Sequence, residues 1–249
     1  MSAKWLKRLC VVLLTLFVAP LLITACSKVS LGADWRTANR DSAGLAPNPA
    51  TTQEAVVQVY GARAFNWRGI FAVHTWIAVK ADGADQYTVH QVIGWRARHG
   101  GSAVVSGPGV PDRNWYGAKP QIYKDIRGAD AEALIPKIEA AVGSYPHAHR
   151  YVLWPGPNSN SFTAHIAREV PGLAVDLPPT AIGKDYIGNG NLFGPAPSNT
   201  GIQISLFGLL GLTLAIEEGI ELNVLTLGVG VDPLDLGIRL PGIGRLSLL

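Results

Sequence analysis

Residues 71–80, which read FAVHTWIAVK, decide the fold class. β-branched and aromatic residues fill this run, and such residues favour strands. Similar runs at 55–64 and 87–96 lie on either side of it, with Gly or Asp turns between them. Because short connections favour antiparallel neighbours, we expect a three-stranded meander in which His74 and Trp76 share one face.

The next hundred residues combine loops and helices. Residues 99–120 contain several Gly and Pro turn signals and are expected to form a loop. The spacing of apolar residues predicts a helix over 130–142, with Asp130 as its N-cap. Residues 151–154 are expected to form a short strand that leads, through a Pro-Gly-Pro turn, into a helix over 162–170. The predicted fold class is therefore α+β with a largely antiparallel sheet.

The N-terminus has the pattern of an export signal. Basic residues at positions 4, 7 and 8 precede an apolar run over 9–23, and this order is typical of a secretory signal. The run contains Pro20 and is shorter than the roughly 20 apolar residues of a spanning helix.

The run ends in Ile23-Thr24-Ala25-Cys26, which resembles the bacterial lipobox, whose cysteine is diacylated and becomes the new N-terminus. This resemblance implies a lipoprotein of the cell envelope that is held at the membrane and faces the periplasm. The alternative is an uncleaved signal anchor that ends near Cys26.

Composition excludes several kinds of chemistry. The two cysteines, Cys10 and Cys26, both lie in the N-terminal segment, so the folded part has no disulfide, cysteine nucleophile or thiolate metal site. The formal net charge of +3 also comes from this segment, because its three basic residues leave 18 basic against 18 acidic residues in the rest of the chain. We expect no nucleic-acid partner, no cofactor and no bound metal.

The chain divides into four parts. Residues 1–26 form the signal peptide with its lipobox, and the polar residues 27–53 form a flexible tether. Residues 54–200 form the α+β core, and residues 201–249 form a β-rich, apolar extension of the same domain.

The C-terminal extension carries few charges. Between residues 202 and 231 the only charged residues are Glu217, Glu218 and Glu221, which we expect in a solvated turn between strands. Alternation of apolar and polar residues predicts two or three half-buried strands. Their apolar side could pack on lipid or on a partner protein.

The helix that follows Pro155-Gly156-Pro157 begins at a candidate catalytic site. Free backbone N–H groups at a helix N-terminus stabilise an oxyanion and favour the charged form of a nucleophile. Ser159 is best placed as the nucleophile, with His74 as its base and the amides near Asn160 as oxyanion donors. The simpler interpretation is that residues 158–161 only cap the helix, since Asn and Ser are preferred N-cap residues.

A family resemblance bears on this site. Residues 158–162, Asn-Ser-Asn-Ser-Phe, and the strand around His74 resemble the Asn-Cys-Asn-x-Phe block and early histidine strand of circularly permuted papain-like proteins. That group includes desumoylating isopeptidases and the lecithin retinol acyltransferase type. The resemblance implies a permuted papain-like core. Ser159 stands where that group has its cysteine, so cysteine-type activity is not implied.

The mature chain is more similar to an uncharacterised bacterial group, domain-of-unknown-function family 3750. The resemblance rests on Trp67-Arg68-Gly69, on Pro155 to Asn160, and on residues 181–186 and 217–223, and it extends over most of residues 35–245. No activity is assigned to that family, so the resemblance implies none.

Other candidate residues follow weaker patterns. Arg63, Trp67 and Arg68 suit a cationic and aromatic lip for a glycan or a carboxylate. Trp76 and Asn158 complete the candidate binding residues.

Two pairs of polar residues that lie close together in the sequence have simple expected roles. Lys184 and Asp185 are expected to form a local ion pair in a turn. His147 and His149 are expected at the surface, because no third metal ligand is evident beside them.

Two functions follow from these patterns. The first is a non-catalytic envelope protein that binds a cell-wall component or another protein in a degraded active-site cleft. The second is a serine-dependent hydrolase or acyltransferase that acts on amide or ester bonds through Ser159 and His74. We prefer the first, because a serine is a poor nucleophile in a site built around a thiolate.

Overall fold

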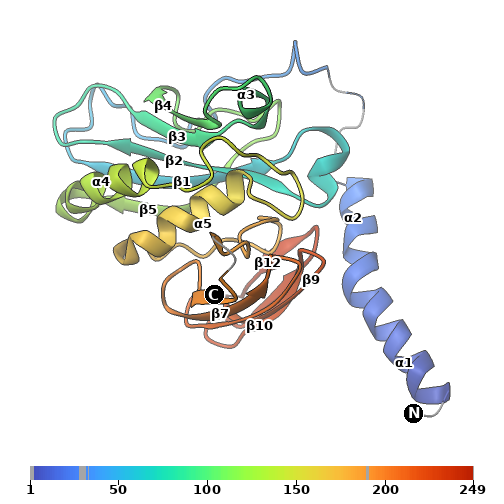
Figure 1. Ribbon diagram of the computed structural model, residues 1–249. Coiled ribbons are helices and arrows are strands. Elements are labelled where there is room, and N and C mark those ends of the chain that lie inside the picture. Colours follow the sequence, from blue (N-terminus) through green and yellow to red (C-terminus); the bar gives the residue numbers. More distant parts are fainter. Residues whose placement is uncertain (1–2, 28–31, 33, 189–190, 249) are drawn as a thin grey trace.

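The computed structural model describes residues 3–27, 32, 34–188 and 191–248. It contains one antiparallel sheet of five strands and another of seven, with a helix between them and a long N-terminal helix at one side (Figure 1). The fold is α+β with a β-rich C-terminal part, as the sequence predicts.

The first sheet has the strand order β4-β3-β2-β1-β5. Its strands are β1 (Val56–Arg63), β2 (Val73–Lys80), β3 (Thr88–Val92), β4 (Val104–Pro108) and β5 (Gln121–Arg127). The predicted meander is confirmed, because β1, β2 and β3 pair as antiparallel neighbours. The third strand is shorter than expected, since the chain enters the short helix α3 (Gly94–Arg98) soon after it.

Both edge strands of this sheet are missing from the prediction. Strand β4 lies in the segment expected to be a loop, and β5 carries alternating charges. Each pairs on one side only, within the part of the chain that the structure describes. Half-exposed edge strands lack the continuous apolar run by which a central strand is recognised.

Helices cover one face of the first sheet. They are α4 (Gly128–Gly143) and α5 (Ser159–Glu169), and two short 3-10 turns, η2 (Asn66–Ile70) and η3 (Pro171–Leu173), complete this part. Ile77 of β2, Ile138 of α4 and Phe162 of α5 are fully buried in the core between sheet and helices. Helix α4 starts at Gly128, with Asp130 in its first turn rather than at its N-cap. The expected strand at 151–154 is absent, and these residues form bends.

The other face of the first sheet carries aromatic side chains. Tyr60 and Trp76 stack here with ring centroids 5.6 Å apart, and partly buried residues such as Leu45 and Trp115 cover them. The second half of the expected tether therefore packs on the domain. The Asp112 carboxylate holds it there by accepting hydrogen bonds from the Ser42 hydroxyl and the Leu45 backbone N–H.

The N-terminal helix is longer than the apolar run at 9–23 indicates. It consists of α1 (Ala3–Leu13), the π-helical turn η1 (Leu14–Val18) and α2 (Ala19–Ser27). The π turn directly precedes Pro20, whose ring excludes the normal α-helical hydrogen bond. Residues Lys4–Ser27 are long and apolar enough to cross a membrane, a property that signal sequences share. The helix is thus compatible with a signal peptide or a membrane anchor.

The second sheet is a meander of seven strands in the order β12-β11-β10-β9-β8-β7-β6. Its strands are β6 (Phe193–Pro195), β7 (Gly201–Leu206), β8 (Leu210–Ala215), β9 (Gly219–Val224), β10 (Leu227–Asp232), β11 (Gly237–Leu240) and β12 (Gly244–Leu246). The expected half-buried strands are present, and there are more of them than the two or three predicted.

The buried side of this sheet is the polar one. Gln203, Thr213 and Glu221 face the rest of the domain and are almost completely buried. Their neighbours in sequence, among them Ile204 and Leu222, are exposed. The usual assignment of an antiparallel sheet, with apolar residues inside and polar residues outside, is inverted here.

Candidate functional site

Asn158 caps helix α5 in a full capping box. Its side-chain Oδ1 accepts hydrogen bonds from the backbone N–H of Asn160 and of Ser161, and the Ser161 hydroxyl accepts one from the Asn158 backbone N–H. Its Nδ2 donates to the carbonyl of Ile182. Gly183, with a φ of +98°, passes so close that a Cβ would lie 2.5 Å from Nδ2 of Asn158. The capping interpretation of residues 158–161 is therefore confirmed.

Asn160 joins the helix to the first sheet. Its Nδ2 donates to the carbonyls of Val73 and Ile182, at 3.0 and 2.8 Å. Its Oδ1 accepts from the hydroxyl of Thr75, which also donates to Thr163 Oγ1. The side chain is saturated by structural hydrogen bonds, so it positions the helix on β2.

His74 lies on the opposite face of the sheet. Successive strand residues alternate between faces, and Thr75 points to α5, so His74 points away from it together with Trp76. The His74 ring stacks on Trp115 with centroids 3.6 Å apart, and its Nε2 donates to Gln91 Oε1 at 3.3 Å. Burial lowers the pKa of His74 to about 3, and the nearby charge of Arg113 also lowers it.

The proposed serine and its proposed base are therefore not brought together. Among the described residues the Ser159 side chain has no hydrogen-bond partner, and the hydrogen bonds of this residue run through its carbonyl, to Thr75 and Thr163. A general base must lie within hydrogen-bond reach of the proton that it accepts. A neutral His74 on the far face of β2 does not meet this condition, and the geometry offers no support for hydrolysis at Ser159.

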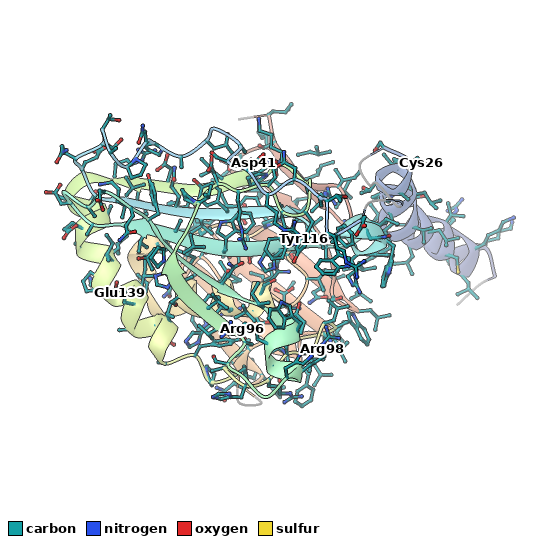
Figure 2. The ribbon with its side chains drawn as sticks, turned by 90° about the horizontal axis from the view of Figure 1, so that it is seen from above. Cys26, Asp41, Arg96, Arg98, Tyr116 and Glu139 are labelled. Atoms are coloured by element: carbon teal, nitrogen blue, oxygen red, sulfur yellow. The ribbon has the colours of Figure 1, made fainter. Side chains whose placement is uncertain are left out.

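A pocket opens on the face that carries His74. It has a volume of about 290 Å³, and Gln91 and Trp115, which both contact His74, belong to its lining. Three cationic and three aromatic side chains also line it, namely Arg40, Arg96, Arg113, Trp95, Trp115 and Tyr116. Figure 2 shows Arg96 and Tyr116 on the same side of the molecule.

Within the described part of the chain, the arginines of the pocket form no ion pair with an acidic side chain. The ion pairs in the described part of the chain involve other cations, among them Arg127, Lys184 and Arg239. Burial lowers the pKa of Arg113, and the nearby charge of Arg40 acts in the same direction. Concentrated positive charge without a counter-charge is the electrostatic condition for binding an anion.

Aromatic rings and backbone carbonyls hold these arginines in place. The Arg40 guanidinium lies 4.5 Å from the Tyr116 ring centroid and donates to the carbonyl of Ala38. Arg113 lies 5.6 Å from the ring centroid of Trp115, and Arg96 Nε donates to the carbonyl of Ser102. Planar guanidinium groups that stack on aromatic rings leave N–H donors free for a carboxylate or a phosphate.

Comparison with known protein families identifies the chain. A family model described as "Protein of unknown function (DUF3750)" matches residues 54–186, which is more than half of the sequence. The chain belongs to the DUF3750 family. No curated protein and no solved structure matches it.

The DUF3750 region runs from β1 to the segment after α5. It includes His74, the capping residues of α5 and every pocket residue named above except Arg40. Residues 217–223, which also carried the resemblance to this family, lie outside the matched region. No comparison supports the distant papain-like resemblance.

The predicted cationic and aromatic lip only partly exists in this DUF3750 protein. Trp67 is exposed, with the Arg68 guanidinium 5.3 Å from its ring centroid. Arg63 instead donates to the carbonyls of Gly69 and Ile243, which ties the first sheet to the C-terminus. Trp76 is buried, and its Nε1 donates to the Pro111 carbonyl at 2.7 Å.

Sequence reasoning missed the pocket residues, although a signal was present. Residues 94–98 and 113–117 each combine arginine with tryptophan in a short glycine-bounded segment. The first segment lies at the end of an expected strand and the second lies in the expected loop. In such places the spacing of apolar residues does not predict which side chains come together. Only the pairing of β3 with β4 brings them to one face.

Two of the three expected solvated glutamates, Glu218 and Glu221, are instead buried, which corrects the sequence interpretation, whereas Glu217 is partly exposed. Glu221 is 1 % exposed and forms ion pairs with Lys184 at 2.6 Å and Arg239 at 2.7 Å. Arg239 also contacts Asp176, and Glu218 accepts a hydrogen bond from the Ser198 hydroxyl. Alternation alone could not reveal this, because it does not say which side of a sheet is covered.

The predicted ion pair of Lys184 with Asp185 is present at 2.8 Å. Both groups are buried, so the pair belongs to the same network as Glu221 rather than to an exposed turn. Burial alone would lower the pKa of Lys184, but the charges of Asp185 and Glu221 raise it above its usual value. These groups stay charged because each has a partner.

Two histidines lie at or near a second, wider cavity. His147 belongs to the lining of this cavity of about 410 Å³, with His165 and Tyr186, and burial lowers the pKa of both histidines. His149 is exposed, as the sequence predicts, and is not part of this lining. Among the described residues no group of three or more His, Cys, Asp or Glu side chains is placed to hold a metal ion.

Proposed function

We propose that this DUF3750 protein is an exported, membrane-anchored binding protein of the bacterial envelope that holds an anionic ligand in the pocket beside His74. The observation that carries the proposal is the pocket itself, in which Arg40, Arg96 and Arg113 converge without an anionic partner. A carboxylate or a phosphate supplies the missing charge and accepts bidentate hydrogen bonds from a guanidinium group.

The aromatic lining defines the rest of the ligand. Trp95, which is 53 % exposed, offers a flat apolar surface, and an aromatic ring of this kind packs against the face of a ring in a ligand while leaving its polar edges free. A carboxylated sugar of the cell wall combines the two features that the pocket selects, a negative charge and a ring. The function is binding, since the pocket contains no nucleophile with a base in reach.

Calorimetric titration of the full chain in detergent tests this proposal. N-acetylmuramic acid, which carries a carboxylate, is expected to bind, and uncharged N-acetylglucosamine is expected to bind at least about tenfold more weakly. A hydrogen bond to a charged group is worth about 1.5–3 kcal/mol, and a factor of ten corresponds to about 1.4 kcal/mol. Equal affinity for the two sugars, or no binding of either, contradicts the proposal.

Two neighbouring arginines provide a matched pair of variants. Arg96 and Arg98 both belong to α3, but only Arg96 lines the pocket, and both are labelled in Figure 2. Arg96→Gln should weaken binding of the carboxylated sugar about tenfold, whereas Arg98→Gln should leave it within about twofold. An equal loss in both variants would indicate attraction by the general charge of α3 and not by the pocket.

The anchoring part of the proposal concerns Cys26. Its side chain is exposed at the end of the N-terminal helix and forms no disulfide, which leaves it free for acylation. Metabolic labelling with a clickable fatty acid should mark the protein, and Cys26→Ser should abolish the label. Label that persists in this variant would exclude a lipid at Cys26.

A further inference from the structure

The outward face of the seven-stranded sheet is a continuous apolar surface. Cross-strand pairing aligns its exposed positions in rows, and the longest row crosses every strand from β6 to β12. This row consists of Pro195, Ile202, Leu214, Ile220, Val231, Ile238 and Leu246. A second row runs parallel to it and consists of Phe193, Ile204, Leu212, Leu222 and Val229. Neither row contains a charged or polar side chain.

Two of the hairpin turns at the ends of these strands expose large apolar side chains. Phe207 lies in the turn between β7 and β8, and Leu225 in the turn between β9 and β10, and both are more than half exposed. Both also adopt a positive φ, a conformation in which Gly, Asn or Asp is the usual residue. Bulky apolar residues at such positions carry a steric cost, so the turns themselves do not call for these side chains.

The buried network fixes this face outward. Slipping a strand by one residue would exchange its two faces, but Glu221 of β9 and Arg239 of β11 hold each other and Lys184 on the inner side. Asn223 adds hydrogen bonds to Asp185 and to the carbonyl of Gly208. A slip by one residue would turn the apolar side chains toward the interior and would leave several charged groups without partners. The ion pairs therefore keep the apolar side of the sheet facing outward.

The N-terminal helix lies at the edge of this sheet. Its middle turn η1 contacts β10, and Leu21 and Thr24 of α2 lie against Gly242, in the turn between β11 and β12. In Figure 1 the helix runs down the side of the second sheet. The helix is itself apolar enough to cross a membrane, so these contacts place an apolar segment beside the sheet.

We infer that the outward face of the seven-stranded sheet rests on the lipid bilayer and is a second membrane contact beside the N-terminal anchor. A surface without charges matches the acyl region, where an unpaired charge is costly, and contiguous exposed apolar patches mark interaction sites. The contact holds the domain in one orientation, with the first sheet turned away from the lipid. This inference rests on the membrane-anchored part of the proposed function and not on its pocket.

Spin-label accessibility in vesicles tests the inference. The full chain with Cys10→Ser and Cys26→Ser retains the N-terminal helix and is reconstituted into vesicles of phosphatidylethanolamine and phosphatidylglycerol. A label at Leu222→Cys, on the outward face, should collide more often with dissolved oxygen than with a water-soluble nickel chelate. A label at Glu139→Cys, on the exposed side of α4, should show the reverse and serves as the matched control (Figure 2).

Each outcome decides between occupants of the face. Easy access of the nickel chelate to Leu222→Cys overturns the inference, because the face then meets water. Protection from both reagents also overturns it, because the face is then covered by protein, such as a second copy of the chain. Ile220→Cys gives the same readout if Leu222→Cys does not fold. Flotation with the vesicles is measured first. Failure to float overturns the inference, because the sheet face and the N-terminal helix together then do not hold the domain at the lipid, and it does not bear on a lipid at Cys26, which this variant lacks.

Discussion

The five-stranded sheet buries Val59 and Ile77 under helices, whereas the seven-stranded sheet buries Glu221 and Arg239 and leaves Leu222 exposed. The first sheet follows the usual rule that apolar area leaves water on folding. The second gains little from that effect on its inner side. There, every buried charge needs a partner, since an isolated buried charge costs far more than a buried apolar group gains.

The difference also separates two ways of fixing strand register. In the first sheet, shape and volume in a packed core select the register. In the second, a few charged pairs between β9, β11 and the segment around Lys184 do so. A sheet that is held by ion pairs on its inner side does not need its outer face for stability. That face can therefore contact another surface.

The largest expected effect comes from breaking the buried network. Arg239→Met leaves Glu221 and Asp176 buried without their common partner, and removal of one member of such a pair typically costs about 3–5 kcal/mol. Urea unfolding of the full chain in mild detergent should show this loss in the free energy of unfolding.

Arg127→Met is the control for this measurement. Arg127 pairs with Asp125 at about one-third exposure on both sides, and surface pairs contribute about 0–1 kcal/mol. If Arg239→Met costs no more than Arg127→Met, the second sheet is not held by charge pairing, and the contrast between the two sheets fails.

A smaller effect should follow from matched truncations in the two sheets. Ile77→Ala empties a fully buried site in the first sheet and should cost about 2–5 kcal/mol. Leu222→Ala removes a side chain that is 46 % exposed and should cost less than about 1 kcal/mol in the same unfolding assay. A loss at Leu222 as large as at Ile77 would mean that this face is buried in solution.

Sequence patterns predicted the first sheet far better than the second. Strands β1 to β3 could be predicted because they are rich in β-branched and aromatic residues, above all Val. Helix α4 could be predicted because its apolar residues recur at helical spacing. In β9, Ile220-Glu221-Leu222-Asn223 does alternate, but alternation is the same whichever side is buried. The inner side is polar only because Lys184 and Arg239 reach Glu221 from distant parts of the chain, and such contacts have no local signature.

The candidate site also combines features that the local sequence predicts with features that depend on distant contacts. The cap at Asn158 is a local interaction and was predicted as one of two alternatives. His74 is separated from Ser159 because successive residues of β2 point to opposite faces of the sheet. Thr75 faces helix α5, so His74 faces away from it. The pocket depends on α3, on β4 and on the segment around Arg113, and the sequence pattern placed two of these in a loop.

The smallest of the expected effects is a difference in pH sensitivity between the sheets. His74 is neutral when folded, with its pKa lowered by burial to about 3, whereas an unfolded histidine titrates near about 6.5. Below that pH the unfolded chain binds a proton that the folded chain does not, so stability falls with falling pH until the folded pKa is reached. The loss between about pH 6.5 and pH 5 is about 2 kcal/mol, at about 1.4 kcal/mol per pH unit.

Glu221 of the second sheet should not contribute over this range. Burial would raise the pKa of Glu221, but Lys184 and Arg239 lower it below its usual value, so its contribution is lost only at more acidic pH. Urea unfolding at pH 7 and pH 5 should therefore show a smaller pH dependence in His74→Gln than in the unaltered chain. His99→Gln, which changes an exposed histidine, should leave the dependence unchanged. If His74→Gln retains the full dependence, His74 does not carry the acid sensitivity, which then arises from other buried groups such as His90 of β3, whose pKa burial lowers to about 4.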